Sequence, residues 1–175
     1  KLHRLDPQHR QRLLHLEHAF HPHRSRGPFN IEHQLAAILA RKQFPTAMLL
    51  PTVAVSTPDG VRAAVLRIVE KMGRPLVLYI KDAGYVTLPV VKSLVEAGAI
   101  SWIKYAVVRP DPAQDDLLAA LVQTVDPALI VSGIGEQPAI THWTKFGVRS
   151  FTSGCVCVAP RRSQVRVIQS IAPGW

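Results

Sequence analysis

Short apolar segments alternate with helical segments between residues 31 and 160. The apolar segments are hydrophobic at consecutive positions, which is typical of strands that are buried on both faces of a parallel sheet. One intervening segment starts with Thr57 and Pro58, a capping residue and a first-turn residue, and stops at Gly73. Repetition of this pattern predicts consecutive βα units, which place the chain in the α/β class.

Five such units are expected. The predicted strands lie near residues 47–53, 76–80, 100–106, 129–133 and 148–154. The predicted helices of this region cover residues 31–42, 57–73, 87–98, 111–125 and 137–147. Two architectures fit this order, an open doubly wound sheet and part of a (β/α)₈ barrel. Both gather functional groups at the carboxyl ends of the strands, so we expect the site there.

The two ends of the chain differ from this region in composition. Residues 1–30 hold six Lys/Arg against two acidic residues, and residues 161–175 hold three Arg and no acidic residue. Residues 31–160 are nearly balanced, with twelve basic and ten acidic residues. We therefore expect a basic, His/Arg-rich segment 1–30 that packs poorly, a domain 31–160 and a basic segment 161–175. Because the net charge of +9 comes mainly from the ends, it does not by itself indicate a nucleic-acid partner.

No metal site or cofactor is expected. The histidines of residues 1–30 lack a nearby set of cysteines or carboxylates at a recognised ligand spacing. Cys155 and Cys157 are too close in sequence for an ordinary structural disulfide, and two reduced thiols indicate a cytoplasmic protein. No apolar run is long enough to cross a bilayer, so no membrane partner is expected.

Lys104 lies inside the apolar segment SWIKYAVV, although lysine is almost never buried without a partner. Alternation along a strand puts Trp102, Lys104 and Ala106 on one face and Tyr105 on the other. Tyr79 lies near the end of the preceding strand, so its hydroxyl is expected near the Lys104 amine. Apolar surroundings favour a neutral amine, which can attack a ketone and form a Schiff base while Tyr79 moves protons. The residues alone leave an alternative, in which Lys104 reaches solvent or pairs with an acid.

Further candidates follow the last two predicted strands. Gly133 and Gly135 lie between a strand and a helix, where a phosphate-binding turn is one interpretation, although the full glycine spacing is absent. Glu136 either orients a substrate or favours the start of the next helix. Thr152 ends the last strand, and His142 is expected to be a packing residue of the helix before it.

Five successive pieces of the chain carry a family resemblance. PLVLY is similar to a tyrosine strand, ISWIKYA to a strand with a Schiff-base lysine, IVSGIGE to the strand after it and FGVRSFTSG to a last strand. QLAAILARKQFPTAMLLPT is similar to the helix and fourth strand that precede them. Together they resemble the dihydrodipicolinate synthase / N-acetylneuraminate lyase family over about residues 30–160. The resemblance implies a (β/α)₈ TIM barrel, present here as a partial barrel of about five βα units, strands four to eight.

The resemblance also implies an activity. Members of this family form a Schiff base between a lysine and pyruvate or a related 2-oxo acid, without a cofactor, so the chain is expected to be a lyase or aldolase. Lys104 and Tyr79 match the catalytic lysine and tyrosine. The substrate contacts implied on the neighbouring strands are Ser132, Gly133, Gly135, Glu136 and Thr152.

The chain departs from the family pattern in three places. The Gly-Thr-Thr/Ser-Gly-Glu motif that binds the substrate carboxylate has no counterpart. PTVAV and KDAGY stand where members that make dihydrodipicolinate carry a tyrosine after Pro-Pro and an arginine, which speaks against the lysine-biosynthesis substrate.

Two other functions stay open, a catalytically inactive fragment and a basic binding module. Because five units leave two open sheet edges, we also expect the chain to form a homo-oligomer, to rearrange or to belong to a longer chain.

Overall fold

The computed structural model describes residues 31–40, 46–51 and 57–153. The expectations for residues 1–30 and 154–175 lie outside these ranges. The described residues contain a five-stranded sheet in which all neighbouring strands are parallel, in the order β1-β2-β3-β4-β5. The strands are β1 (Met48–Leu49), β2 (Leu76–Ile80), β3 (Ile100–Tyr105), β4 (Ile130–Ser132) and β5 (Ser150–Phe151).

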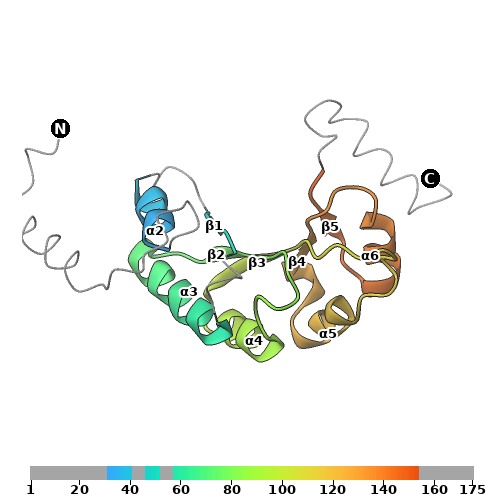
Figure 1. Cartoon of the computed structure of the whole chain (residues 1–175), viewed down its shortest axis with the longest axis horizontal. Helices are drawn as coiled ribbons and strands as arrows, with labels where there is room; N and C mark the ends of the chain where they lie inside the picture. Colours follow the sequence, from blue (N-terminus) through green and yellow to red (C-terminus); the bar gives the residue numbers. More distant parts are fainter. Residues whose placement is uncertain (1–30, 41–45, 52–56, 154–175) are drawn as a thin grey trace, which may run out of the picture.

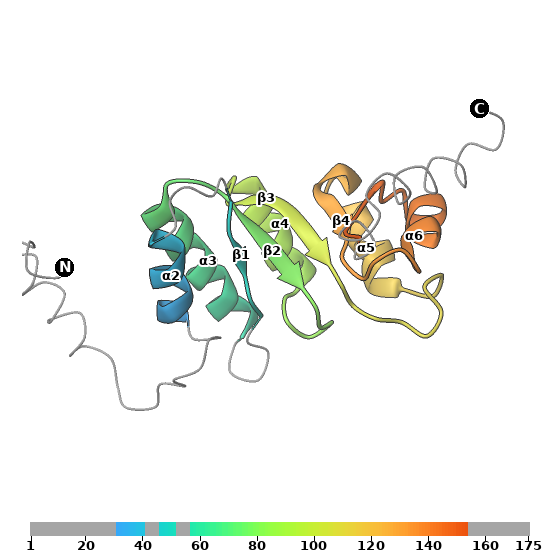
Figure 2. The ribbon, with the colours of Figure 1, turned by 90° about the horizontal axis from the view of Figure 1, so that it is seen from above.

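Helices connect the strands. They are α2 (Ile31–Leu39), α3 (Pro58–Met72), α4 (Leu88–Glu96), α5 (Asp116–Thr124), the short 3₁₀ helix η3 (Pro127–Leu129) and α6 (Ala139–Phe146). Figure 1 shows α3, α4 and α5 along one side of the sheet, and Figure 2 shows β2 and β3 face-on from the opposite side. Among the described elements, none covers that opposite face.

The strand order distinguishes the two architectures that the sequence left open. A doubly wound sheet reverses its strand order at a switch point and carries helices on both faces. Here the strands follow one another in sequence order and the helices lie on one side, which is the arrangement of successive units in a barrel. The α/β class and the partial-barrel architecture are therefore confirmed.

The ends of α3 follow directly from its sequence. The Thr57 side chain accepts a hydrogen bond from the Gly60 amide at 3.1 Å, and Pro58 occupies the first turn. Gly73 ends the helix with φ of 71°, in the left-handed region where a side chain is disfavoured. The predicted helix 57–73 is thus confirmed at both ends.

Helix α5 starts later than the sequence indicates. The predicted start at Asp111 is wrong because the Asp111 carboxylate accepts the Ala113 amide at 2.9 Å, which forms a local turn. Asp115 is the capping residue instead, and its carboxylate accepts the Leu118 amide at 3.1 Å. Two acidic residues with capping ability lie four positions apart, and tertiary contacts of the second one decide which begins the helix.

The hydrophobic core lies between the sheet and the helices. Side chains from both layers that are completely buried there include Leu76, Leu78, Ile103, Ile130, Val65, Ile68, Leu94, Leu118 and Leu121. Because alternate residues of a strand point to opposite faces, burial of Ile103 and Tyr105 on the helical side places Lys104 on the face that the described helices leave open.

Candidate active site

Lys104 lies one residue before the end of β3, in the middle of the sheet. It is directly opposite Tyr79 of β2 on one side and Val131 of β4 on the other. These three residues share the open face of the sheet, and all three are half-buried. Tyr79 and Lys104 therefore lie at the same level on neighbouring strands.

The Lys104 side chain leans across Tyr79. Its Nζ lies 4.8 Å from the centroid of the Tyr79 ring, within the range of a cation–π contact. A Cβ built on Gly133 would approach Lys104 Cγ to 2.7 Å and Lys104 Cε to 3.0 Å. The aliphatic stem of the lysine therefore passes over a glycine that has no side chain to obstruct it. Tyr79, Lys104 and Gly133 form one cluster, which we call the lysine cluster.

A second cluster, of three polar side chains, lies on the helical side of the sheet, opposite the lysine cluster. The Tyr105 hydroxyl donates a hydrogen bond to Asp115 Oδ2 at 2.7 Å. Arg109 Nε lies 3.3 Å from Asp115 Oδ1, and the Asp115 side chain has no exposed surface. Burial raises the pKa of the Tyr105 phenol, and the hydrogen bond to Asp115 raises it further, so Tyr105 stays protonated and donates.

Ser132 does not join the lysine cluster. It pairs with Tyr105 and therefore faces the helices, where it is 1% exposed. Its Oγ lies 2.9 Å from Nδ1 of His142 on α6, which joins β4 to that helix. Burial lowers the pKa of His142, although the Asp115 charge acts in the opposite direction, so the imidazole is neutral near neutral pH. The Ser132 side chain is therefore not available to a ligand on the open face.

The other predicted contacts lie on the loop after β4 and at the end of β5. Gly135 has a φ of 90°, so a side chain at this position would be strained. The Ser153 hydroxyl donates a hydrogen bond to Glu136 Oε1. The Thr152 amide donates to the Ser132 carbonyl at 2.8 Å. Glu136 and Thr152 therefore belong to a connected region beyond the last two strands, at the carboxyl edge where Lys104 also lies.

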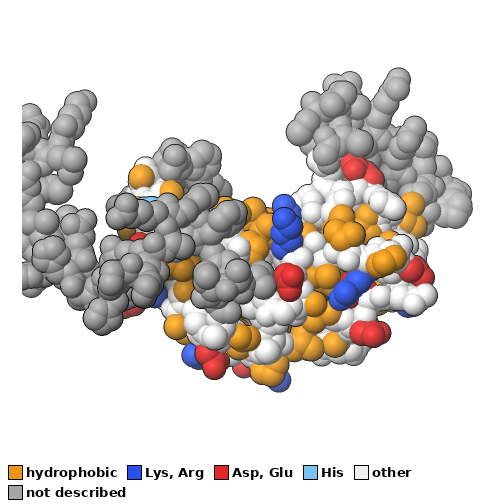
Figure 3. Space-filling model, in the orientation of Figure 1, with side chains coloured by type: hydrophobic (Ala, Val, Ile, Leu, Met, Phe, Trp, Pro, Cys, Tyr) orange, Lys and Arg blue, Asp and Glu red, His pale blue; other side chains and the backbone are white. Residues whose placement is uncertain are grey.

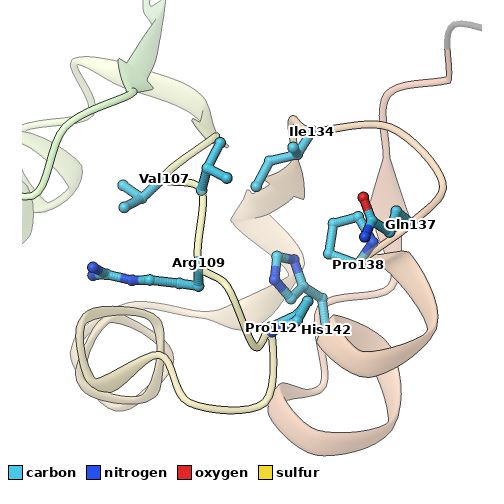
Figure 4. A pocket seen from close by; sticks show the side chains of 8 residues that line it. Val107, Arg109, Pro112, Ile134, Gln137, Pro138 and His142 are labelled. Carbon is cyan, nitrogen blue, oxygen red and sulfur yellow. The ribbon is translucent and has the colours of Figure 1, made fainter.

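A small pocket opens between the loop after β3 and the start of α6 (Figure 4). Figure 4 shows the His142 ring pointing into this pocket and the Arg109 side chain extending away from it. The lining residues are Val107, Val108, Arg109, Pro112, Ile134, Gln137, Pro138 and His142. Neither Lys104 nor Tyr79 lines it, so this pocket is separate from the lysine cluster.

The sequence did not indicate that Asp115 and His142 are polar partners of β3 and β4. Asp115 falls within the predicted helix 111–125, and His142 was expected only to pack. Each lies ten residues after its partner, with Tyr105 and Asp115 in one pair and Ser132 and His142 in the other. Each contact spans a βα loop, so no local pattern in the sequence marks these two partners.

The described part of the chain offers no group of three or more His, Cys, Asp or Glu residues that could hold a metal ion. Its helices are all too short or too polar to cross a membrane. The face shown in Figure 3 carries scattered basic and acidic side chains among hydrophobic ones, without an extended basic patch. This distribution agrees with the balanced charge of residues 31–160.

Comparison with solved structures gives two matches at a probability of 1.00. The dihydrodipicolinate synthase from Bacillus clausii superposes with a TM-score of 0.61 and 23% identity over 77% of this chain. The dihydrodipicolinate synthase from Oceanobacillus iheyensis gives 0.56 and 25% identity over 80% of this chain. This chain has the fold of part of a dihydrodipicolinate synthase. The matches span only 45% of the length of either synthase.

The dihydrodipicolinate synthase-like fold agrees with the family resemblance found in the sequence. These synthases are TIM barrels, so the five described strands correspond to a portion of such a barrel. No protein-family model matches the chain, and the search of curated proteins gives no significant match.

Proposed function

We propose that Lys104 forms a Schiff base with a small 2-oxo acid, pyruvate being the simplest, in a lyase or aldolase reaction. The observation that carries the proposal is the position of Lys104 Nζ over the Tyr79 ring, at the carboxyl edge of the sheet. Active sites of (β/α)₈ barrels lie at this edge. The likeness of the fold to dihydrodipicolinate synthases supports the same assignment.

The chemistry requires a nucleophilic amine and a group that moves protons. After losing a proton, the Lys104 amine attacks the carbonyl carbon of pyruvate, and the resulting carbinolamine loses water to give an iminium ion. Loss of a proton from the adjacent methyl group gives an enamine, whose carbon attacks an aldehyde in the condensation direction. The reverse sequence cleaves the same carbon–carbon bond.

Tyr79 is the proton carrier in this proposal. Its ring lies beneath the Lys104 amine, and its hydroxyl is the acid and base for formation and loss of the carbinolamine. Gly133 leaves the space that the lysine stem needs. Gly135, Glu136 and Thr152 border the substrate on the far side of Lys104.

Borohydride trapping tests the proposal. The protein is incubated with pyruvate and borohydride, and its intact mass is measured. The expected result is a single reduced adduct that is absent from Lys104→Arg, because arginine keeps the charge but cannot form the imine. Lys81→Arg is the matched control, since Lys81 is an exposed lysine just beyond the end of β2. Loss of the adduct in both variants, its persistence in Lys104→Arg, or no adduct at all would contradict the proposal.

A further inference from the structure

We propose that Tyr105, Asp115 and Arg109 form a positioning linkage that fixes the orientation of β3 and thereby holds Lys104 over Tyr79. The catalytic consequence of this linkage rests on the function proposed above. The placement of Lys104 itself does not, and it can be measured without any substrate.

Tyr105 is fixed on three sides. Its carbonyl accepts the Gly133 amide at 2.6 Å, which joins it to β4. The next amide, that of Ala106, donates to the Ile80 carbonyl at 2.8 Å, which joins it to β2. Its hydroxyl donates to Asp115 at 2.7 Å, which joins it to the start of α5. The third connection is the only one made by a side chain, and it limits rotation of the strand about its own axis.

Packing alone does not account for this hydroxyl. Tyr105 has no exposed surface, and burial of a hydroxyl or a carboxylate is unfavourable unless each is hydrogen-bonded. Phenylalanine would fill the same volume without requiring a buried partner. Asp115 compensates the burial by accepting from Tyr105 and Leu118, and Arg109 supplies the opposite charge.

Lys104 and Tyr105 are consecutive residues with side chains on opposite faces of one strand. A rotation of β3 about its own axis that moves the Tyr105 ring toward one neighbouring strand therefore swings the Lys104 stem toward the other. Gly133 allows the stem a close approach but does not hold it, because it has no side chain. The hydrogen bond from Tyr105 to Asp115, on the helical side of β3, therefore determines where the Lys104 amine lies on the open face.

The test observes Lys104 directly. Reductive methylation with ¹³C-formaldehyde labels the lysine amines, and the Lys104 resonance is assigned by its loss in Lys104→Arg. Methyl groups over the face of Tyr79 are shifted upfield by the ring current, as the 4.8 Å approach of Nζ to the ring requires. Lys92 is an internal reference, because its side chain is 60% exposed.

In Tyr105→Phe we expect the Lys104 resonance to lose most of its upfield shift while the Lys92 resonance stays in place. Tyr85→Phe is the matched control, since it removes the hydroxyl of another buried tyrosine outside β3, and it should leave the Lys104 resonance unchanged. Arg109→Gln keeps the Tyr105 hydrogen bond and should move the Lys104 resonance in the same direction by less. An unchanged Lys104 resonance in Tyr105→Phe, or an equal change in Tyr85→Phe, would overturn the proposal.

The consequence for chemistry is measured on unmethylated protein. Tyr105→Phe should reduce the maximal rate of pyruvate trapping about tenfold at an unchanged half-saturating pyruvate concentration, because a misplaced nucleophile slows the step after binding. Failure of the wild-type protein to form any adduct would count against the proposed function alone. The methyl resonance would still decide whether the linkage positions Lys104.

Discussion

Lys104 Nζ lies 4.8 Å from the centroid of the Tyr79 ring, and the two residues are direct partners across β2 and β3. The register of a parallel sheet fixes this proximity, because neither residue can shift along its strand without breaking the backbone pairing on both sides. A lysine whose only role was to extend from the strand into solvent would not need an aromatic residue directly opposite it on the neighbouring strand. The pair is therefore the feature on which the functional proposal depends.

One substitution distinguishes the role of the Tyr79 hydroxyl from that of the Tyr79 ring. Tyr79→Phe keeps the ring beneath the ammonium group but removes the proton carrier, so pyruvate should still form an adduct. We expect the maximal trapping rate to fall about 10²-fold, which is typical of the loss of one acid–base group. Stopped samples analysed by intact mass give this rate. An unchanged rate would show that Tyr79 only packs against the lysine.

Gly133→Ala tests whether the lysine stem needs the open space beside β4. The new Cβ would lie 2.7 Å from Lys104 Cγ and 3.0 Å from the Tyr105 carbonyl oxygen, so the stem must move. We expect a loss of about 1–3 kcal/mol in the free energy of unfolding, typical of overpacking, together with slower trapping. Urea denaturation and the trapping assay measure the two effects.

Gly84→Ala is the matched control for Gly133→Ala. A Cβ at Gly84 would meet only the Asp82 carboxylate, at 3.3 Å, in a turn far along the chain from β3 and β4. Trapping by Gly84→Ala should equal that of the wild type. Equal slowing by both alanine variants would mean that space beside Lys104 is not the cause.

Burial of His142 should make the free energy of unfolding depend on pH. Burial lowers the pKa of His142 in the folded protein below its ordinary value of 6.5, so below that pH the unfolded chain binds more protons than the folded one. The free energy of unfolding should therefore decrease as the pH falls from about 7.5 to 5. His142→Gln, which does not titrate, should show a smaller decrease in urea denaturation.

His33→Gln is the control for the pH experiment, since His33 is an exposed histidine on α2. It should retain the pH dependence of the wild type. If His142→Gln and the wild type lose stability in parallel across this pH range, His142 does not carry the buried neutral imidazole that the geometry indicates.

The order of the βα units could be predicted because each signal is local. A capping threonine, a first-turn proline and a terminal glycine define α3 within its own sequence, and Thr57 and Gly73 occupy the positions expected of them. Fully apolar strands indicated a parallel sheet, and the observed pairing is parallel throughout.

Side-chain partners could not be predicted in the same way. A strand that is apolar on both faces gives no alternation from which to read its orientation, so Ser132 was grouped with Lys104 although it faces α6. The choice of Asp115 over Asp111 as the cap of α5 depends on the Tyr105 hydroxyl and Arg109, which meet it only after the loop folds. Side-chain contacts that span a loop leave no local pattern in the sequence from which they could be predicted.

The most direct test of Lys104 as the Schiff-base residue is to locate the pyruvate adduct within the chain. Protein reduced with borohydride in the presence of pyruvate is digested, and the peptides are sequenced by mass spectrometry. We predict a carboxyethyl group on Lys104, within the peptide that contains SWIKYAVV, and an unmodified Lys81. A carboxyethyl group spread over exposed lysines with none on Lys104 would contradict the central claim that Lys104 is the Schiff-base residue.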